Sequence, residues 1–298
     1  MTIMEVTGVL EMGPDDVLKV FKNQGFEVQL VDEMREPPLP PLKDVILSGC
    51  PIGREDPAEL PSDVLSLRIF ECHNIRSLSD MPFFQQTNEL RFCSINDCRG
   101  IESLLRLENL DKLHVLVKVA EASIVSTLSS QSIPAIFSNL KSFHIEGCSN
   151  MKQLFPFHLV HDLQNLEDLI IRGCGQIEEI IGSEEEEENH KGNGTQAPTS
   201  FSLPKLKELE LWYLPELKRI CSSNKEMVCN SLREITVVEC TNLKRMPMYL
   251  PLFQDTHQSA PSAHPFEKIR IYPKEWWESV KWDYPNAKEV LRPWLKWF

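Results

Sequence analysis

Cysteine and histidine are the residue types through which this chain could bind a metal ion or attack a substrate. The chain contains nine cysteines and eight histidines. Cys72 and Cys98 are 26 residues apart, as are Cys148 and Cys174, and the sequence has no Cys-x-x-Cys pair. Structural zinc sites normally use closely spaced cysteine pairs. The spacing therefore predicts buried structural thiols and no metal site.

Histidine offers no better candidate for catalysis. His158 and His161 flank a leucine in a predicted return segment, without an acidic residue at ligand spacing. Cys72 and His73 are expected on different faces of a turn, and no Ser, His and Asp grouping is accompanied by a glycine elbow. We therefore expect a chain that is not an enzyme.

The elements that carry the cysteines are copies of one template. Residues 140–154 and 166–180 align without gaps, with apolar residues at positions 1, 4 and 6, cysteine at position 9, and apolar residues at positions 12 and 15. Self-similarity at a fixed period indicates a repeat architecture, and this period and template are typical of leucine-rich repeats.

The template also predicts how each copy folds. Apolar residues at alternate positions suit a short strand, and the later spacing of three suits a 3₁₀-like return. One coil cannot bury its own apolar side, so the coils must stack. The expected fold class is α/β: a right-handed leucine-rich-repeat solenoid with a parallel concave β-sheet and short helical or 3₁₀ convex segments.

The copies divide the chain into regions. Residues 1–40 are a poorly defined N-terminal segment or a degenerate repeat, and residues 41–272 are the solenoid. Residues 273–298 hold most of the tryptophans and are expected to form a C-terminal cap. Within the solenoid, about 182–202 include five consecutive glutamates beside Gly, Asn and Pro, which predicts a disordered acidic insertion.

Three further strands are predicted with less support from the template. Phe26–Val31 alternates weakly, Leu110–Val115 begins a fourth copy that loses its cysteine, and Phe266–Ile271 is expected to be the last strand of the stack.

The composition limits the partners. The net charge is −13, which argues against nucleic acid or an anionic membrane surface as the main partner. No apolar stretch is long enough to insert into a membrane, and the first ten residues lack the pattern of a signal peptide. An odd number of cysteines that need not pair suits a reducing compartment, so we expect a cytoplasmic location.

The solvent-facing strand residues are the candidate binding residues, because side chains alternate along a strand. Ile170, Trp212 and Val238 are predicted to be exposed beside charges, as in interface hot spots. Alternatively, Trp212 packs on Tyr213 and belongs to the scaffold. The full set predicted to bind a partner on the concave face is His144, Glu146, Asp168, Ile170, Arg172, Glu208, Glu210, Trp212, Glu234, Thr236 and Val238.

Several segments outside the bare template carry a more specific signal. They are 146–156, 163–169, the glutamate run with its preceding residues at 178–188, 214–221, 243–247, and Glu-Trp-Trp-Glu-Ser-Val-Lys-Trp-Asp at 275–283. In these segments the chain resembles the C-terminal leucine-rich-repeat region of plant intracellular immune receptors, the coiled-coil nucleotide-binding leucine-rich-repeat (NLR) disease-resistance proteins.

The resemblance implies a protein-recognition module of plant innate immunity. Its partner would be a pathogen effector or a host protein that the effector alters, and in a full-length receptor also the nucleotide-binding domain. Gly8 and Gly13 have the spacing of a phosphate-binding loop, but Pro14 and Asp15 stand where Lys and Ser/Thr are needed. We therefore expect a fragment without a cofactor, with ADP or ATP bound only on the missing domain.

Two alternatives stay open at this point. A leucine-rich-repeat substrate receptor of a ubiquitin ligase also carries cysteine at this spacing, but it needs an F-box-like segment, and residues 1–40 are short and rich in proline. An enzyme built on the loops would need a clustered acid–base set, which the sequence does not display.

Overall fold

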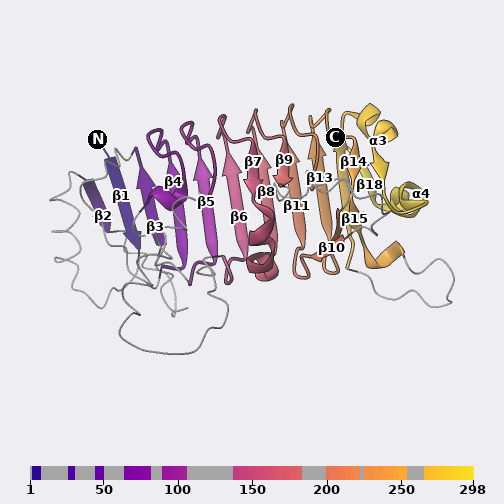
Figure 1. Ribbon diagram of the computed structural model, residues 1–298, viewed down its shortest axis with the longest axis horizontal. Coiled ribbons are helices and arrows are strands. Elements are labelled where there is room, and N and C mark those ends of the chain that lie inside the picture. The colour runs from indigo at the N-terminus through magenta and orange to yellow at the C-terminus, as the bar shows by residue number, and fades with distance from the viewer. Residues whose placement is uncertain are drawn as a thin grey trace, which may run out of the picture.

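The computed structural model describes residues 2–7, 26–30, 44–49, 64–81, 89–105, 137–182, 199–221, 225–253 and 265–298. These residues form a stack of coils along one long sheet, which we call the main sheet (Figure 1). Its 11 strands are β1 (Thr2–Thr7), β2 (Phe26–Leu30), β3 (Asp44–Ser48), β4 (Ser66–Phe70), β5 (Phe92–Asn96), β6 (Ser142–Glu146), β8 (Asp168–Arg172), β11 (Glu208–Trp212), β13 (Glu234–Val238), β16 (Lys268–Tyr272) and β18 (Leu295–Trp297).

The main sheet follows the chain from coil to coil. Its strand order is β18-β16-β13-β11-β8-β6-β5-β4-β3-β1-β2, and every pair is parallel except β1 with β3. The register places equivalent template positions beside one another, for example Phe143 beside Leu169 and Leu169 beside Leu209. All three side chains are buried. The predicted parallel leucine-rich-repeat sheet is thereby confirmed.

The return segments lie on the core side of the main sheet and build short elements of their own (Figure 1). They include the 3₁₀ segments η1 (Leu78–Asp80), η3 (Phe157–Asn165) and η5 (Pro251–Phe253). Three small parallel sheets join β7 (Gln153–Phe155) with β9 (Glu179–Ile181), β14 (Arg245–Met246) with β17 (Lys281–Trp282), and β10 (Thr199–Ser202) with β12 (Lys225–Val228) and β15 (Met248–Tyr249).

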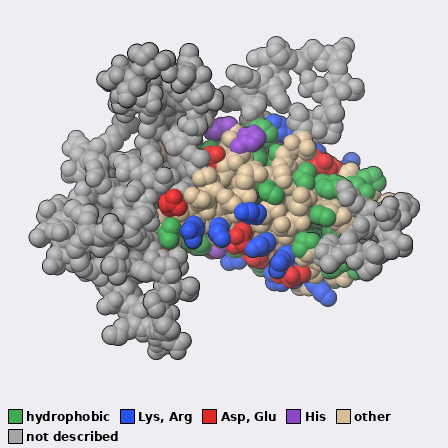
Figure 2. Space-filling view, turned by 90° about the horizontal axis from the view of Figure 1, so that it is seen from below, with side chains coloured by type: hydrophobic (Ala, Val, Ile, Leu, Met, Phe, Trp, Pro, Cys, Tyr) green, Lys and Arg blue, Asp and Glu red, His purple; other side chains and the backbone are tan. Residues whose placement is uncertain are grey.

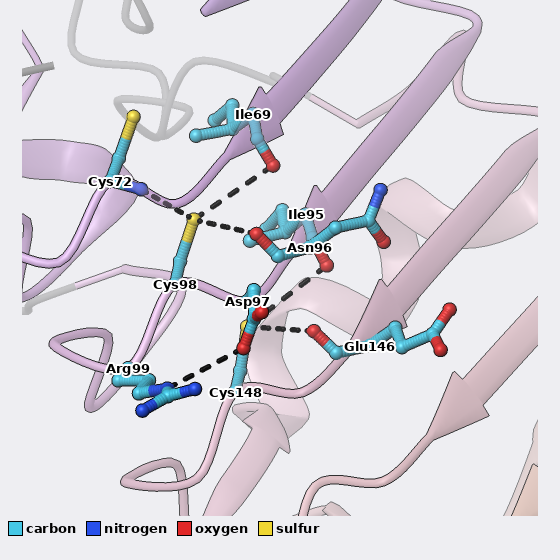
Figure 3. A network of polar contacts seen from close by, with 9 residues as sticks. All are labelled: Ile69, Cys72, Ile95, Asn96, Asp97, Cys98, Arg99, Glu146 and Cys148. Carbon is cyan, nitrogen blue, oxygen red and sulfur yellow. Dashed lines mark hydrogen bonds and ion pairs between the residues drawn. The ribbon is translucent and has the colours of Figure 1, made fainter. Parts of the chain in front are cut away.

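The repeated cysteines lie buried beside the strand ends (Figure 3). The Cys98 Sγ accepts a hydrogen bond from the Cys72 backbone N–H at 3.4 Å and contacts the carbonyl oxygens of Ile69 and Asn96 at 3.8 and 3.3 Å. Burial raises the pKa of the Cys93 and Cys240 thiols to about 12. The cysteines that the structure describes are therefore small buried hydrophobic residues, as predicted; Cys50 lies outside the described residues.

The last coils are closed by the segment from α3 (Lys274–Ser279) through α4 (Ala287–Leu291) and η7 (Arg292–Trp294) to β18. Trp276 and Trp277 are buried against the core, and the Trp276 Nε1–H donates to the Leu243 carbonyl at 2.8 Å. β18 pairs with β16 and adds a strand beyond it. The prediction that Phe266–Ile271 would be the last strand is therefore wrong, because the chain returns to the sheet after α4 and η7.

One other boundary differs from the sequence interpretation. The predicted acidic insertion includes Thr199–Ser202, but these residues form β10, where Phe201 is buried and pairs beside Met227. β5 pairs directly with β6, and the predicted fourth copy at Leu110–Val115 lies outside the described residues. The weak alternation after Phe26 does correspond to a strand, β2. Residues 106–136 and 183–198 lie outside the described residues.

Candidate protein-recognition surface

The side of the main sheet turned away from the core, which we call the open face, carries the predicted binding residues in three rows. The register of β6, β8, β11 and β13 aligns them strand by strand. The first row is Ser142, Asp168, Glu208 and Glu234; the second is His144, Ile170, Glu210 and Thr236; the third is Glu146, Arg172, Trp212 and Val238. All eleven predicted residues are therefore brought together on four neighbouring strands.

Glu210 is the centre of a polar cluster on this face. Its Oε2 accepts a 2.5 Å hydrogen bond from the Arg172 guanidinium and a 3.1 Å hydrogen bond from the Trp212 Nε1–H. Its Oε1 lies 3.8 Å from the guanidinium of Arg270. The Arg172 guanidinium also lies 5.5 Å from the centroid of the Trp212 ring, within cation–π range. Glu210 was predicted to face solvent, but these neighbours bury it.

Thr236 and Val238 were also predicted to be exposed, and this is wrong. Their exposed fractions are 0% and 4%. Trp212 lies beside Val238 in the same row, and its ring approaches that of Phe298 to 5.3 Å between centroids. We attribute the burial of Val238 to these rings, which come from elements on both sides of it. Trp212 also lies 6.4 Å from Tyr213, so it takes part in scaffold packing as well.

A second cluster lies on the preceding coils. The Phe92 ring meets the His144 ring edge-on at 5.1 Å, and the Arg68 guanidinium lies 5.4 Å from the Phe92 centroid. The His144 Nε2 and the Ser142 Oγ share a 3.1 Å hydrogen bond. Burial, the largest cause, lowers the pKa of His144. The imidazole is therefore neutral at physiological pH and contributes shape and a hydrogen bond to this surface.

Sequence reasoning missed Arg68, Phe92 and Arg270, although each occupies a second- or first-row position of its own strand. The same template positions, applied to the earlier copies and to the last one, would have found them. Phe298 could not be found in this way, because it follows β18 and belongs to no copy of the template.

Like Asp168 of the same row, which accepts a 3.3 Å hydrogen bond from the Ser142 hydroxyl, Glu208 lacks a basic partner among the described ion pairs. Its neighbour Glu234 lies 2.6 Å from the Lys268 ammonium and 3.3 Å from the Arg270 guanidinium. Burial, followed by the nearby carboxylates of Glu210, Glu234 and Asp168, raises the pKa of Glu208. The ionised form of Glu208 is therefore disfavoured in the folded protein.

Glu208→Gln is expected to stabilise the protein at pH 7 by roughly 0.5 kcal/mol, the scale of a like-charged cross-strand pair. A raised folded-state pKa gives stability that is present below the ordinary pKa of a glutamate and is lost as pH rises through the raised pKa. The gain should therefore vanish on acidification. Urea unfolding at pH 7 and near pH 3.5 measures both values.

Glu234→Gln is the matched control in the same row, and it should destabilise the protein at pH 7 because it removes the partner of Lys268 and Arg270. If both variants changed the free energy of unfolding in the same direction, the assignment of charges in this row would be contradicted.

A separate charged feature lies along one edge of the main sheet. At this edge the strands from β3 onward begin. Figure 2 views the protein from this side and shows Lys and Arg side chains in a band interrupted by Asp and Glu. Glu167 pairs with Lys141 at 3.3 Å and with Lys207, and the hydrogen bond from Lys207 is the main cause that lowers the pKa of Glu167. These pairs satisfy one another and are each worth little in water, so the edge is a weaker binding candidate than the open face.

Within the described ranges, no group of three or more His, Cys, Asp or Glu side chains is arranged to hold a metal ion. The helices of the same part of the chain are all too short or too polar to cross a membrane.

Comparisons with known proteins agree with this architecture. Residues 126–249 match a family model described as the leucine-rich repeats of RPS2-like plant disease resistance proteins. The chain is 32% identical over 113 residues to "Probable disease resistance protein At4g27220" of Arabidopsis thaliana, covering 36% of this chain and 11% of that protein. It is 32% identical over 166 residues to "Probable disease resistance protein At1g12290" of the same plant, covering 52% and 16%. The chain thus spans less than a fifth of the curated relatives it matches.

Proposed function

We propose that this chain, which contains a leucine-rich-repeat region of the plant NLR disease-resistance type, is a non-catalytic module that recognises another protein through the open face of its main sheet. In this proposal the partner is a pathogen effector or a host protein that an effector has altered, met in the cytoplasm. In a full-length receptor the nucleotide-binding domain is a further, intramolecular partner.

The observation that supports this function best is the cluster of Arg172, Glu210 and Trp212. Arg and Trp are the residue types that most often dominate protein interfaces. The Arg172 side chain keeps 43% of its surface exposed while Glu210 holds its guanidinium in place. Because the cluster is ordered before any partner arrives, binding loses little side-chain entropy.

The neighbouring rows supply specificity. Glu208 and Asp168 present carboxylates beside the cluster, and His144 and Phe92 present a neutral aromatic surface on the preceding coils. A partner must therefore match a fixed pattern of charge and apolar area, and mismatched charges would be penalised. A partner that binds one of two receptor states more tightly shifts the population toward that state.

The test uses protein binders selected against the whole chain from a display library. These binders are expected to lose roughly 30-fold in affinity or more with Arg172→Glu and with Trp212→Ala, the scale of an interface hot spot. Isothermal titration calorimetry measures the affinities, and circular dichroism verifies that each variant is folded.

Lys218→Ala is the control, since Lys218 is paired with Glu178 at 2.6 Å in a return segment, away from the open face. Selected binders that lose affinity with Lys218→Ala and keep it with both open-face variants would refute the proposed surface.

A further inference from the structure

The open face is already in contact with an aromatic side chain of the chain itself. Phe298 follows β18, and its backbone N–H donates to the Ile271 carbonyl at 3.4 Å. Its ring meets the Trp212 ring edge-on, with 5.3 Å between centroids and 65° between planes. The Arg270 guanidinium lies 5.8 Å from the Phe298 centroid.

The contact between Trp212 and Phe298 bridges two intervening strands of the main sheet. β13 and β16 stand between β11, which carries Trp212, and β18, which precedes Phe298. At about 4.8 Å per strand spacing, the two backbones are roughly 14 Å apart. Trp212 and Phe298 therefore reach toward each other over the intervening strands, on which Val238 is almost fully buried.

The second row of the open face, beside this contact, contains a buried polar group without a hydrogen-bond partner. Thr236 is fully buried in the second row, between Glu210 and Arg270 in register. Its Oγ1 is among the buried polar atoms of the described residues that have no hydrogen-bond partner. A buried hydroxyl without a hydrogen-bond partner is unfavourable. With the Phe298 ring in place, the hydrogen-bonding capacity of Thr236 is therefore left unused.

Phe298 is also held loosely. Its exposed fraction is 57%, and the large hydrophobic side chains that the described residues expose, Tyr213, Tyr272, Trp297 and Phe298, all belong to the last coils or to the turn after β11. One aromatic pair and one cation–π contact favour a bound ring over a free one by roughly tenfold. The ring can therefore leave the site.

We propose that Phe298 occupies a subsite for an aromatic side chain of a protein partner, formed by Trp212 and Arg270, and that the partner enters by displacing the Phe298 ring. An aromatic ring fits because it forms a T-shaped pair with Trp212 and its π-system lies near a guanidinium, whereas an aliphatic side chain provides no π-system. The inference rests on the proposed function, since it names the chemistry that the open face recognises.

The test uses N-acetyl-phenylalanine amide as an uncharged probe and N-acetyl-leucine amide as the aliphatic comparison. Binding is followed through the Trp212 indole N–H resonance, assigned from its loss in Trp212→Phe. Phe298→Ala is expected to bind the phenylalanine probe roughly tenfold more tightly than the wild-type chain, because the competing ring is gone. The leucine probe should bind Phe298→Ala at least about threefold more weakly than the phenylalanine probe does, because it provides no π-system.

Two controls distinguish binding at the subsite from nonspecific binding to the protein surface. Tyr213→Ala removes an equally exposed aromatic residue next to Trp212 and should leave the affinity for the probe unchanged. Phe298→Ala combined with Arg270→Gln, which keeps the Trp212 resonance, should bind the phenylalanine probe more weakly than Phe298→Ala alone, because the guanidinium beside the ring is gone. The circular dichroism spectrum of Phe298→Ala should match that of the wild type, because the residue is exposed.

The outcomes also separate this inference from the proposed function. If Phe298→Ala gains no affinity for the phenylalanine probe, or binds the leucine probe as tightly as the phenylalanine probe, the subsite is wrong. Library binders that still lose affinity with Arg172→Glu would then leave protein recognition by the open face standing. If the affinity of the binders were unchanged by both Arg172→Glu and Trp212→Ala, the proposed function would be refuted instead.

Discussion

Trp276→Ala is expected to lower the free energy of unfolding by about 3–5 kcal/mol, the usual range for removing a buried tryptophan. The Trp276 ring has an exposed fraction of 2%, and its Nε1–H satisfies the Leu243 carbonyl at 2.8 Å. The substitution opens a cavity between α3 and the return segment of the β13 coil, and it also leaves that buried carbonyl without this donor. Urea unfolding followed by far-UV circular dichroism gives the change.

Trp297→Ala is the matched control for this prediction. Trp297 lies in the same C-terminal segment but has an exposed fraction of 46%. Its substitution should change the free energy of unfolding by less than about 1 kcal/mol. If the two variants were equally stable, Trp276 would not be needed to cover the apolar end of the repeat stack.

Gly100→Ala is expected to lower the free energy of unfolding by about 3 kcal/mol, at the upper end for overpacking. A Cβ atom at Gly100 would lie 1.9 Å from the His73 carbonyl oxygen and 2.9 Å from the Ile75 carbonyl oxygen. Both atoms belong to the backbone of the preceding coil, so the coils would have to separate. The same urea titration detects the change.

Gly175 tests the cause of that loss. It lies at the neighbouring position of a later copy of the template, and a Cβ atom there would meet nothing within 4 Å. Gly175→Ala should be neutral or stabilise by up to about 1 kcal/mol, because alanine restricts the unfolded chain. A large loss at both glycines would show that the turn, and not contact between coils, sets the requirement.

Local sequence pattern predicts the repeated part of this fold well, because each coil depends mainly on its own residues and its neighbours. Leu140, Phe143 and Cys148 occupy their template positions and are buried as expected. The glutamate run and the Trp-Trp segment favoured a plant resistance protein over a ubiquitin-ligase receptor. The family model and both named relatives support that choice.

The sequence could not predict contacts made between distant segments. Val238 occupies an outward position, and only the return of the chain to β18 brings Phe298 toward it. Likewise, an outward glutamate such as Glu210 is normally exposed, but Arg172 and Arg270 converge on it from two other strands. Alternation predicts which side of the sheet a residue occupies, whereas its exposure depends on the neighbours that cover it.

The row of buried cysteines has a consequence for how the opening of this protein can be observed. Cys72, Cys98, Cys148, Cys174 and Cys240 each belong to a different coil, and all five thiols are buried. An alkylating reagent reaches a thiol only when the coil around it opens, so its labelling rate reports the free energy of that local opening. The native chain thus carries its own set of probes for the order in which its coils come apart.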